Sequence, residues 1–196
     1  STDKACNPSS VYGSTKMVAE QLWIGGNGGK HKTRFSALRY GNVLGSQGSV
    51  LDLWNEQARN GMPLTITNPD MTRFYVRIDD AAKLVLSVVD RMNGMEIFIP
   101  KLKSATTRQL AEALFPYDPL DIRNQVRPGE KSHEILLMPE EIEYTRDQGD
   151  LYVRYPNVDP VVLSCRMTGR SLPDGFRYGS KWADRLTLDE IEGMVE

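Results

Sequence analysis

Cysteine is rare in this chain, with only Cys6 and Cys165 among its 196 residues. Two cysteines are too few for a disulfide framework and their spacing matches no zinc site, so we expect no bound metal and a reducing, cytoplasmic location. No apolar run reaches the roughly 18 to 20 residues that span a bilayer, and the first residues show no charged segment followed by a hydrophobic one. We therefore expect no membrane insertion by these residues.

An excess of positive charge is also absent. Lysine and arginine together number 24 against 26 for aspartate and glutamate, which gives a formal net charge of −2. Because the basic residues are scattered, the chain does not have the electrostatic footprint of a nucleic-acid-binding protein. A phosphate-bearing ligand would need a local pocket. With 40% hydrophobic residues, the chain is long enough for one main core and a small subdomain.

Helical and strand patterns alternate along the chain, which predicts an α/β fold. Apolar residues at helical spacing predict helices over 11–24, 50–61, 78–92 and 106–115. Alternating residues predict strands over 34–40, 63–67, 73–77 and 96–100. Ser104 or Thr106 is expected to cap the fourth helix. Pro139 opens a short helix over 139–145, and Thr187 with Glu190 forms a capping box before another.

Tyr12 and Lys16 are four residues apart in the first predicted helix, so they share one face about one turn apart. A lysine ammonium beside a phenol favours the phenolate, which can take a proton from an alcohol while hydride is removed. The same spacing occurs by chance in many helices as a half-buried tyrosine beside a solvated lysine. The flanking residues favour function, because an acid and a base, Asp3 and Lys4, stand on the loop that leads through Pro8 into this helix.

The segment STDKACNPSSVYGSTK resembles the catalytic segment of extended short-chain dehydrogenases that act on nucleotide sugars, and its DK pair resembles UDP-N-acetylglucosamine 4,6-dehydratases. The resemblance continues along most of the chain in order and spacing. Similar stretches are RYGNVLGSQGSV (39–50), DMTRF (70–74), EIFIPK (96–101) and RPGEKSHEIL (127–136). The last two look most like the soluble inverting branch, which feeds pseudaminic acid synthesis.

The resemblance implies the C-terminal part of an extended short-chain dehydrogenase Rossmann fold. Residues 1–60 would be the remainder of the Rossmann-like catalytic region, and residues 61–196 mainly a mixed α/β substrate-binding region with a C-terminal extension. NADP or NAD would be bound mostly by an N-terminal half whose Gly-rich turn is not among these residues, so we expect an inactive fragment. GGNGGK at 25–30 follows a predicted helix and is expected to be a connection, not a phosphate loop.

The same resemblance implies roles for the residues near the start. Tyr12 would accept the proton of the sugar's 4-hydroxyl, with Lys16 holding the cofactor ribose and Thr2 in support near carbon 4. Lys4 would take the hydrogen from carbon 5, and Asp3 would protonate the hydroxyl that leaves carbon 6. Hydride then returns to carbon 6, so the nicotinamide cofactor is recycled and a 4-keto-6-deoxy sugar, inverted at carbon 5, results.

Later motifs are implied to bind the UDP part of the substrate. Two guanidinium groups are candidate partners of phosphate oxygens, and a polar loop before a helix suits a diphosphate. Read without the family, the loop is an ordinary flexible link and the arginines are surface ion-pair partners. The implied substrate-binding residues are Asn42, Ser46, Gly48, Ser49, Val50, Arg73, Arg127 and Glu130.

Two other functions stay open. One is a related epimerase or reductase, although a simple 4-epimerase needs no acid–base pair for elimination. The other is a UDP-binding or assembly module without turnover. The family also tends to form homo-oligomers through the Tyr12 helix and the helix over 50–60. If the chain is isolated, we then expect Leu22, Leu51 and Trp54 to be partly exposed.

Overall fold

The computed structural model describes residues 1–28, 32–156 and 167–195. The chain forms two compact units, each assembled from three stretches of sequence. The first unit consists of Ser1–Tyr40, Ala82–Lys101 and Ile135–Gly179, and the second of Gly41–Ala81, Leu102–Glu134 and Ser180–Glu196. The units therefore alternate along the sequence. The predicted division after residue 60, between a Rossmann-like catalytic region and a mainly substrate-binding region, stays a prediction.

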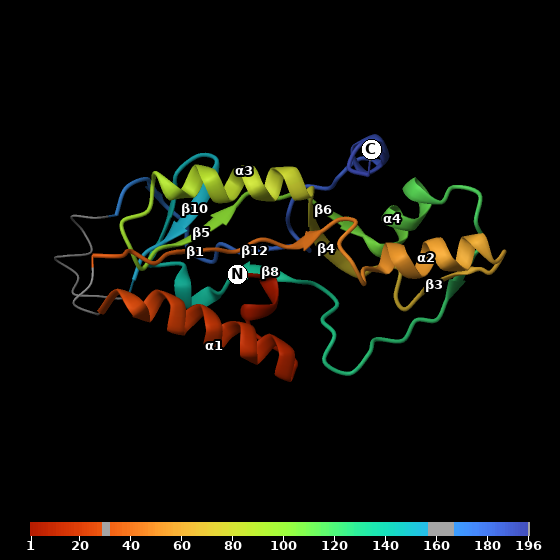
Figure 1. The fold of residues 1–196 in the computed structure, drawn as a ribbon, viewed down its shortest axis with the longest axis horizontal. Coiled ribbons are helices and arrows are strands. Elements are labelled where there is room, and N and C mark those ends of the chain that lie inside the picture. The colour runs from red at the N-terminus through yellow and green to blue at the C-terminus, as the bar shows by residue number, and fades with distance from the viewer. Residues whose placement is uncertain (29–31, 157–166, 196) are drawn as a thin grey trace. The chain divides into compact units, whose positions relative to one another are not determined.

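The first unit is built on a five-stranded sheet with the strand order β1-β5-β10-β9-β11. Its strands are β1 (Ala37–Leu38), β5 (Ile97–Pro100), β9 (Thr145–Asp147), β10 (Leu151–Arg154) and β11 (Arg170–Ser171). β1 and β5 are parallel, whereas the other neighbouring pairs are antiparallel. Two helices, α1 (Val11–Gly25) and α3 (Ile78–Val89), lie on opposite faces of this sheet (Figure 1).

Shorter elements complete the first unit. A two-stranded antiparallel sheet joins β8 (Ile135–Leu137) to β12 (Tyr178–Gly179). The short 3-10 turns are η1 (Asp3–Ala5), η2 (Gly26–Gly28) and η3 (Pro139–Glu141). η2 follows directly on α1, and the rest of the GGNGGK stretch lies outside the described residues. The predicted catalytic residues fall at η1 and on α1.

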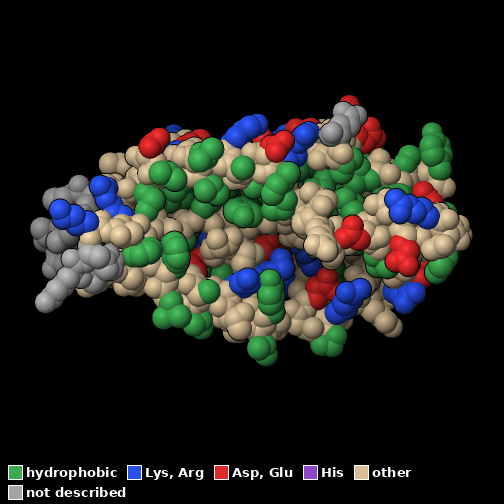
Figure 2. Space-filling model, viewed as in Figure 1, with side chains coloured by type: hydrophobic (Ala, Val, Ile, Leu, Met, Phe, Trp, Pro, Cys, Tyr) green, Lys and Arg blue, Asp and Glu red, His purple; other side chains and the backbone are tan. Residues whose placement is uncertain are grey.

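Helix α3 has apolar side chains both on a buried face and on an exposed face. Val88 packs in the core of the first unit with Leu38 and Phe98. Leu86 and Val89, by contrast, are exposed. Figure 2 shows hydrophobic side chains gathered along α3 on the face in view. The helix, whose residues 78–81 belong to the second unit and 82–89 to the first, therefore leaves apolar side chains exposed among the described residues.

The second unit contains two small sheets and three helices. β2 (Asn42–Val43) is parallel to β4 (Thr72–Val76), which is antiparallel to β6 (Ser104–Thr106). β3 (Leu64–Ile66) is parallel to β7 (Leu120–Ile122). The helices are α2 (Val50–Arg59), α4 (Thr107–Leu114) and α6 (Leu188–Glu192).

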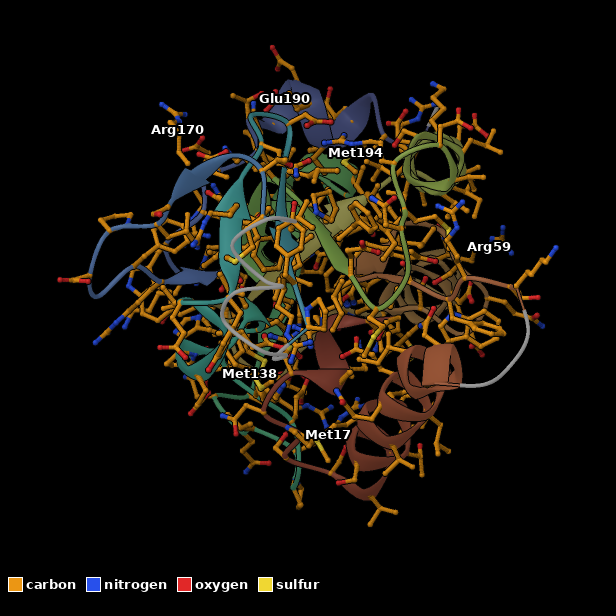
Figure 3. The ribbon with its side chains drawn as sticks, turned by 90° about the vertical axis from the view of Figure 1, so that its left-hand side faces the viewer. Met17, Arg59, Met138, Arg170, Glu190 and Met194 are labelled. Carbon is orange, nitrogen blue, oxygen red and sulfur yellow. The ribbon has the colours of Figure 1, made fainter. Side chains whose placement is uncertain are left out.

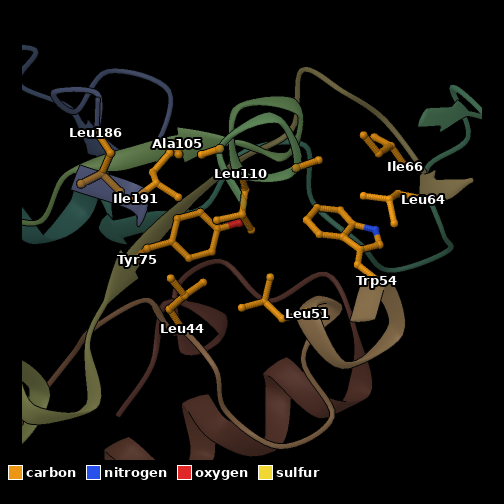
Figure 4. Close-up of a cluster of buried hydrophobic side chains, with 12 residues drawn as sticks. Leu44, Leu51, Trp54, Leu64, Ile66, Tyr75, Ala105, Leu110, Leu186 and Ile191 are labelled. Carbon is orange, nitrogen blue, oxygen red and sulfur yellow. The ribbon is translucent and has the colours of Figure 1, made fainter. Parts of the chain in front are cut away.

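Trp54 lies in the core of the second unit. Its side chain is fully buried, its Nε1 donates to the Thr65 carbonyl at 3.0 Å, and its ring meets Phe115 edge to face. Figure 4 shows the ring beside Leu64. Leu51 is buried in the same core.

The expected exposure of Leu51 and Trp54 is therefore wrong, because α2 turns these side chains onto the core of its own unit. For Leu22 the expectation is confirmed, since this side chain of α1 is 73% exposed. These two α2 side chains are therefore not available for the predicted interface between copies of the chain.

The predicted helices are confirmed, with ends that differ by a few residues. Thr106, not Ser104, caps α4, in a capping box with Gln109, and the capping box of Thr187 and Glu190 is present before α6. The expected helix over 139–145 is only the turn η3, because the chain enters β9 at Thr145. The strand expected over 34–40 pairs only at Ala37–Leu38. No helix in the described ranges is long and apolar enough to span a bilayer.

Candidate active site

Thr2, Asp3 and Lys4 form a compact hydrogen-bonded group at η1. Thr2 caps the turn, because its Oγ1 accepts from the Lys4 backbone N–H at 3.3 Å. The same hydroxyl donates to Asp3 Oδ1 at 2.9 Å, and Lys4 Nζ donates to Asp3 Oδ1 at 3.2 Å. The Asp3 side chain is fully buried, whereas that of Lys4 is 40% exposed. The predicted acid and base are thus in direct contact.

The second carboxylate oxygen of Asp3, Oδ2, is buried and has no hydrogen-bond partner among the described residues. Burying a polar atom without a partner costs free energy, so such an atom indicates a functional role or a missing partner. Oδ2 is therefore the oxygen of Asp3 that can still accept a hydrogen bond from a ligand.

Tyr12 and Lys16 lie on the first two turns of α1. The helix begins at Val11 because Ser10 caps it, with Oγ accepting from the Gly13 N–H at 3.1 Å. Lys16 Nζ lies 5.1 Å from the centre of the Tyr12 ring, so the predicted shared face is confirmed. The Tyr12 side chain is 60% exposed. Figure 3 shows the side chains around α1, including the labelled Met17 that comes after Lys16.

Gly13 brings the start of α1 against the turn that carries Asp3 and Lys4. A β-carbon at this position would lie 2.8 Å from the Lys4 carbonyl oxygen and 3.0 Å from Pro8 Cβ. The first distance is closer than real β-carbon contacts, so any larger residue would have to push the helix and the turn apart. The position next to Tyr12 therefore requires glycine for close approach, not for an unusual φ angle.

Gly13→Ala is expected to lower the free energy of unfolding by about 1 to 3 kcal/mol, because the methyl group overpacks a buried contact. Urea unfolding of the variant measures the change. The control is Gly25→Ala at the other end of α1, where a β-carbon would meet nothing within 4 Å. An alanine there is expected to stabilise the helix slightly. If both variants were equally stable, the Gly13 contact would carry no energetic weight.

Arg39, Glu20 and Glu141 form a buried ion cluster in the first unit that no sequence motif indicates. Burial alone would lower the pKa of Arg39, but its hydrogen bonds to the two carboxylates raise it above the ordinary value. Burial likewise opposes ionisation of Glu20, yet the guanidinium of Arg39 holds the pKa of Glu20 below its ordinary value. The ion pair with Arg39 therefore keeps Glu20 ionised at neutral pH despite its burial.

The second unit contains the residues predicted to bind UDP. Asn42 is in β2 and Ser49 is the residue that precedes α2, and both Asn42 Oδ1 and Ser49 Oγ are buried without a hydrogen-bond partner in the described ranges. Between them the Gly48 N–H donates to Asp52 Oδ2 at 2.6 Å. One of the amides predicted for a diphosphate is therefore already used within the loop, next to a negative charge.

Arg73, Arg127 and Glu130 come together in the second unit. The Arg73 guanidinium donates to the carbonyls of residues 72, 131 and 132 and to Glu130 Oε1, and its side chain is only 12% exposed. The Arg127 backbone N–H donates to Glu130 Oε2 at 3.4 Å. Arg73 thus anchors the loop that carries Glu130, and its predicted contact with phosphate stays a prediction.

Metal binding has no support in the described part of the chain. No group of histidine, cysteine, aspartate and glutamate side chains there is arranged to hold a metal ion. Cys6 is buried in the first unit, whereas Cys165 lies outside the described residues. The groups that this site does offer for chemistry are an acid, a base and a phenol.

Comparison with known proteins gives a consistent picture. A family described as polysaccharide biosynthesis protein matches residues 1–156. The chain is 38% identical over its whole length to a UDP-N-acetylglucosamine 4,6-dehydratase (inverting) of Campylobacter jejuni and covers 63% of that protein. An uncharacterized membrane protein of Methanocaldococcus jannaschii is 46% identical over 80% of the chain, which covers 50% of it. A UDP-glucose 4-epimerase of Rickettsia canadensis is 37% identical over the whole chain, which covers 59% of it.

Solved structures share the fold. The X-ray structure of Pen from Bacillus thuringiensis matches all of this chain with a TM-score of 0.83 and 25% identity, and the chain covers 60% of it. The dTDP-glucose 4,6-dehydratase of Bacillus anthracis in complex with NAD matches 96% of this chain with a TM-score of 0.52 and 13% identity, and is covered to 51%. The predicted fold class is thereby confirmed. The chain spans between half and just under two thirds of these curated relatives.

Proposed function

Because the chain belongs to the polysaccharide biosynthesis protein family, we propose that it is the catalytic and substrate-binding part of a nucleotide-sugar 4,6-dehydratase. The substrate is UDP-N-acetylglucosamine. The sugar is oxidised at carbon 4 and loses water across carbons 5 and 6. It then takes up hydride at carbon 6 and a proton on the opposite face of carbon 5, which inverts that centre. The observation that carries the proposal is the buried Asp3 beside Lys4, held against the helix of Tyr12.

In this reaction Tyr12 takes the proton of the 4-hydroxyl as hydride leaves carbon 4. Lys16, whose Nζ lies 5.1 Å from the centre of the phenol ring, holds the ribose of the cofactor beside Tyr12. The exposed position of the Tyr12 ring leaves room for both a sugar and a nicotinamide ring. Thr2, whose hydroxyl already bonds Asp3, supports the sugar near carbon 4.

The Asp3–Lys4 contact explains how one pair serves as both acid and base. In the ion pair Lys4 holds a proton and Asp3 does not, which is the wrong state for elimination. Transfer of one proton across the 3.2 Å contact gives a neutral amine and a protonated carboxyl group. Lys4 then takes the hydrogen from carbon 5 while Asp3 gives its proton to the hydroxyl that leaves carbon 6. These two steps restore the ion pair.

A nicotinamide cofactor fits this site, because Tyr12 and Lys16 supply the phenol and cation that hydride removal from an alcohol needs. The cofactor, when bound, accepts hydride from carbon 4 and returns it to carbon 6. We propose NADP, with NAD as the alternative, and expect most of its binding groups outside this chain. The fold relative from Bacillus anthracis was solved with NAD.

For UDP, the unpartnered Asn42 Oδ1 and Ser49 Oγ are polar atoms of the second unit with capacity to bind a ligand. We propose that these atoms, the loop at Ser46 and Gly48, and the start of α2 at Val50 hold the diphosphate and sugar. Arg127 is the arginine to contact phosphate, because the Arg73 guanidinium already holds the neighbouring loop. The full-length protein is proposed to act in the cytoplasm as a homo-oligomer in which α1 buries side chains such as Leu22.

A related epimerase is the second candidate, because UDP-glucose 4-epimerases of Rickettsia species are 37% identical over the whole chain. The two reactions share the oxidation at carbon 4 and differ in the later steps. An epimerase returns hydride to carbon 4 on the other face and releases no water. Only the dehydratase uses Asp3 and Lys4 as acid and base.

Product analysis tests the proposal. Full-length protein is incubated with UDP-N-acetylglucosamine and NADP or NAD in deuterium oxide. We expect a 4-keto-6-deoxy sugar nucleotide that has lost one water and carries one solvent deuterium at carbon 5, with no net reduction of the cofactor. A carbon 4 epimer that retains all its oxygen atoms would favour the epimerase. Binding of UDP with no conversion under any condition would favour the non-catalytic module.

A further inference from the structure

All five N–H donors of Arg39 are occupied by neighbours within the first unit. Nε and Nη2 donate to the two carboxylate oxygens of Glu20, at 2.9 and 2.6 Å. Nη1 and Nη2 donate to those of Glu141, at 2.7 and 2.8 Å, and Nη1 also donates to the Leu136 carbonyl at 3.2 Å. Arg39 is fully buried. It therefore has no donor left for a phosphate or a sugar. Its role must be to hold other parts of the protein in place.

One partner of Arg39 stands on the catalytic helix. Glu20 is on α1, one turn beyond Lys16 and two turns beyond Tyr12. The planar guanidinium and the planar carboxylate meet through two parallel hydrogen bonds, a geometry that fixes both orientation and distance. Rotation or sliding of α1 would break both bonds at once. The phenol and ammonium on the first two turns are thus fixed relative to residue 39.

The backbone next to Arg39 holds the other part of the site. Tyr40, the following residue, accepts a hydrogen bond from the Asp3 backbone N–H at 3.2 Å and forms a parallel β-bridge with Thr2. Two consecutive residues therefore hold the two halves of the proposed site, Arg39 through its side chain and Tyr40 through its carbonyl. The contact of Gly13 with the Lys4 carbonyl sets how close the halves can come.

We propose that Arg39 is a positioning residue: with Glu20 it sets the placement of Tyr12 and Lys16 relative to the Asp3–Lys4 pair. This inference rests on the proposed function for its catalytic meaning. The structural part of the inference, that the Arg39–Glu20 hydrogen bonds fix α1, does not depend on the proposed function. Glu141 holds the far side of the guanidinium, in the turn η3, and so keeps Arg39 itself in place.

The test compares Glu20→Gln with Glu96→Gln in the full-length protein. Both residues are 4% exposed and belong to the first unit. Glu96 accepts from the Ser36 hydroxyl and from the turn at Asn93 and Gly94, none of which lies on α1. Loss of one buried carboxylate charge is common to the two variants. We expect kcat to fall by roughly 10- to 100-fold in Glu20→Gln, as for a small misplacement of reacting groups, with KM for the nucleotide sugar little changed. In Glu96→Gln we expect kcat close to that of the wild type.

Equal kcat values in the two variants, at equal loss of thermal stability, would overturn the positioning role. If Glu20→Gln does not fold, Glu20→Asp takes its place, because it retains the charge but shortens the side chain by one methylene and loses the paired hydrogen bonds. The same fall in kcat is expected. Normal turnover by a folded Glu20→Asp variant would likewise contradict the proposal.

Hydrogen exchange separates this inference from the proposed function. The backbone amides of the α1 segment from Tyr12 to Glu20 are expected to exchange faster in Glu20→Gln than in Glu96→Gln, with no substrate present. A wild-type protein that leaves UDP-N-acetylglucosamine unchanged would refute the function, and faster α1 exchange in the same preparation would still support the link. Equal α1 exchange in both variants would refute the link whatever the activity.

Discussion

Tyr12→Phe is expected to lower kcat of the full-length protein by about 10²- to 10⁴-fold, the usual contribution of a positioned acid–base group. The change removes only the phenol oxygen from a side chain that is 60% exposed, so we expect unchanged stability. Oxidation at carbon 4 comes first in the proposed sequence, and without it the hydrogen at carbon 5 is not acidic. Tyr12→Phe should therefore slow both transient cofactor reduction and water loss, by the same factor.

Asp3→Asn is the matched comparison. The amide retains the shape of the buried side chain but cannot deliver the proton that the leaving hydroxyl needs. We expect this variant to reduce the cofactor transiently when it meets substrate, and to release dehydrated product at about 10²- to 10⁴-fold lower rate. Rapid-mixing absorbance measures the first step and mass spectrometry of the sugar nucleotide measures the second. Undiminished dehydration by either variant would be incompatible with the proposed roles.

Arg39→Met is expected to lower the free energy of unfolding by about 3 to 5 kcal/mol at neutral pH, the usual effect of removing one partner from a buried ion pair. Methionine fills much of the volume of arginine but donates no hydrogen bonds. Glu20 and Glu141 then keep their burial and lose the donor that both share. Urea unfolding at neutral pH gives the magnitude.

The pH dependence of this loss has a definite sign. In the wild type, the pKa of Glu20 lies below its ordinary value of 4.5, so its contribution is complete above that value and is lost as the pH falls through the lower, folded-state pKa. In Arg39→Met, burial without the guanidinium raises the pKa of Glu20. The variant should therefore become more stable, relative to the wild type, as the pH is lowered from 7 toward 5. Glu141 still faces Arg154, with 3.8 Å between Nε and Oε1, so Glu20 is the carboxylate expected to respond more strongly. A constant difference over that range would argue against the loss of the guanidinium from Glu20 as the cause.

A triple variant provides the control. Arg39→Met combined with Glu20→Gln and Glu141→Gln removes all three charges, and apolar or neutral replacements of a whole buried ion cluster are often tolerated. We expect it to regain part of the lost stability, measured by the same urea unfolding. If the triple variant were less stable than Arg39→Met alone, the buried neutral amides would cost more unfolding free energy than the carboxylates that have lost Arg39.

The sequence pattern was a good guide to the helices because the signals that form them are local. The apolar spacing of α3 and the capping box before α4 involve residues within a few positions of one another. β9 and β11 carry no comparable signal: they have three and two residues, and only their pairing in register makes them strands. Burial of Trp54 was missed for a related reason, since periodicity gives the apolar face of α2 without saying what covers it.

The same contrast applies to the candidate site. Adjacent Asp3 and Lys4, and Tyr12 with Lys16 one turn apart, are pairs that a sequence displays directly. Arg39 finds its partners 19 and 102 residues away, a distance at which no spacing rule applies. The one local signal was an arginine directly after the buried strand residues Ala37 and Leu38, because a charge in such a place needs a partner.

The alternation of the two units along the chain bears on how the protein is made. β1 emerges from the ribosome with residues 37 and 38, but β9 and β10 come more than a hundred residues later and β11 last, at Arg170–Ser171. The first unit therefore cannot complete its sheet until Arg170 and Ser171 have been synthesised, whereas its apolar strands β1 and β5 exist much earlier. Strands that are far apart in the sequence pair slowly, and apolar surface stays exposed until they do. We therefore expect chaperones to bind the nascent chain before this sheet is complete.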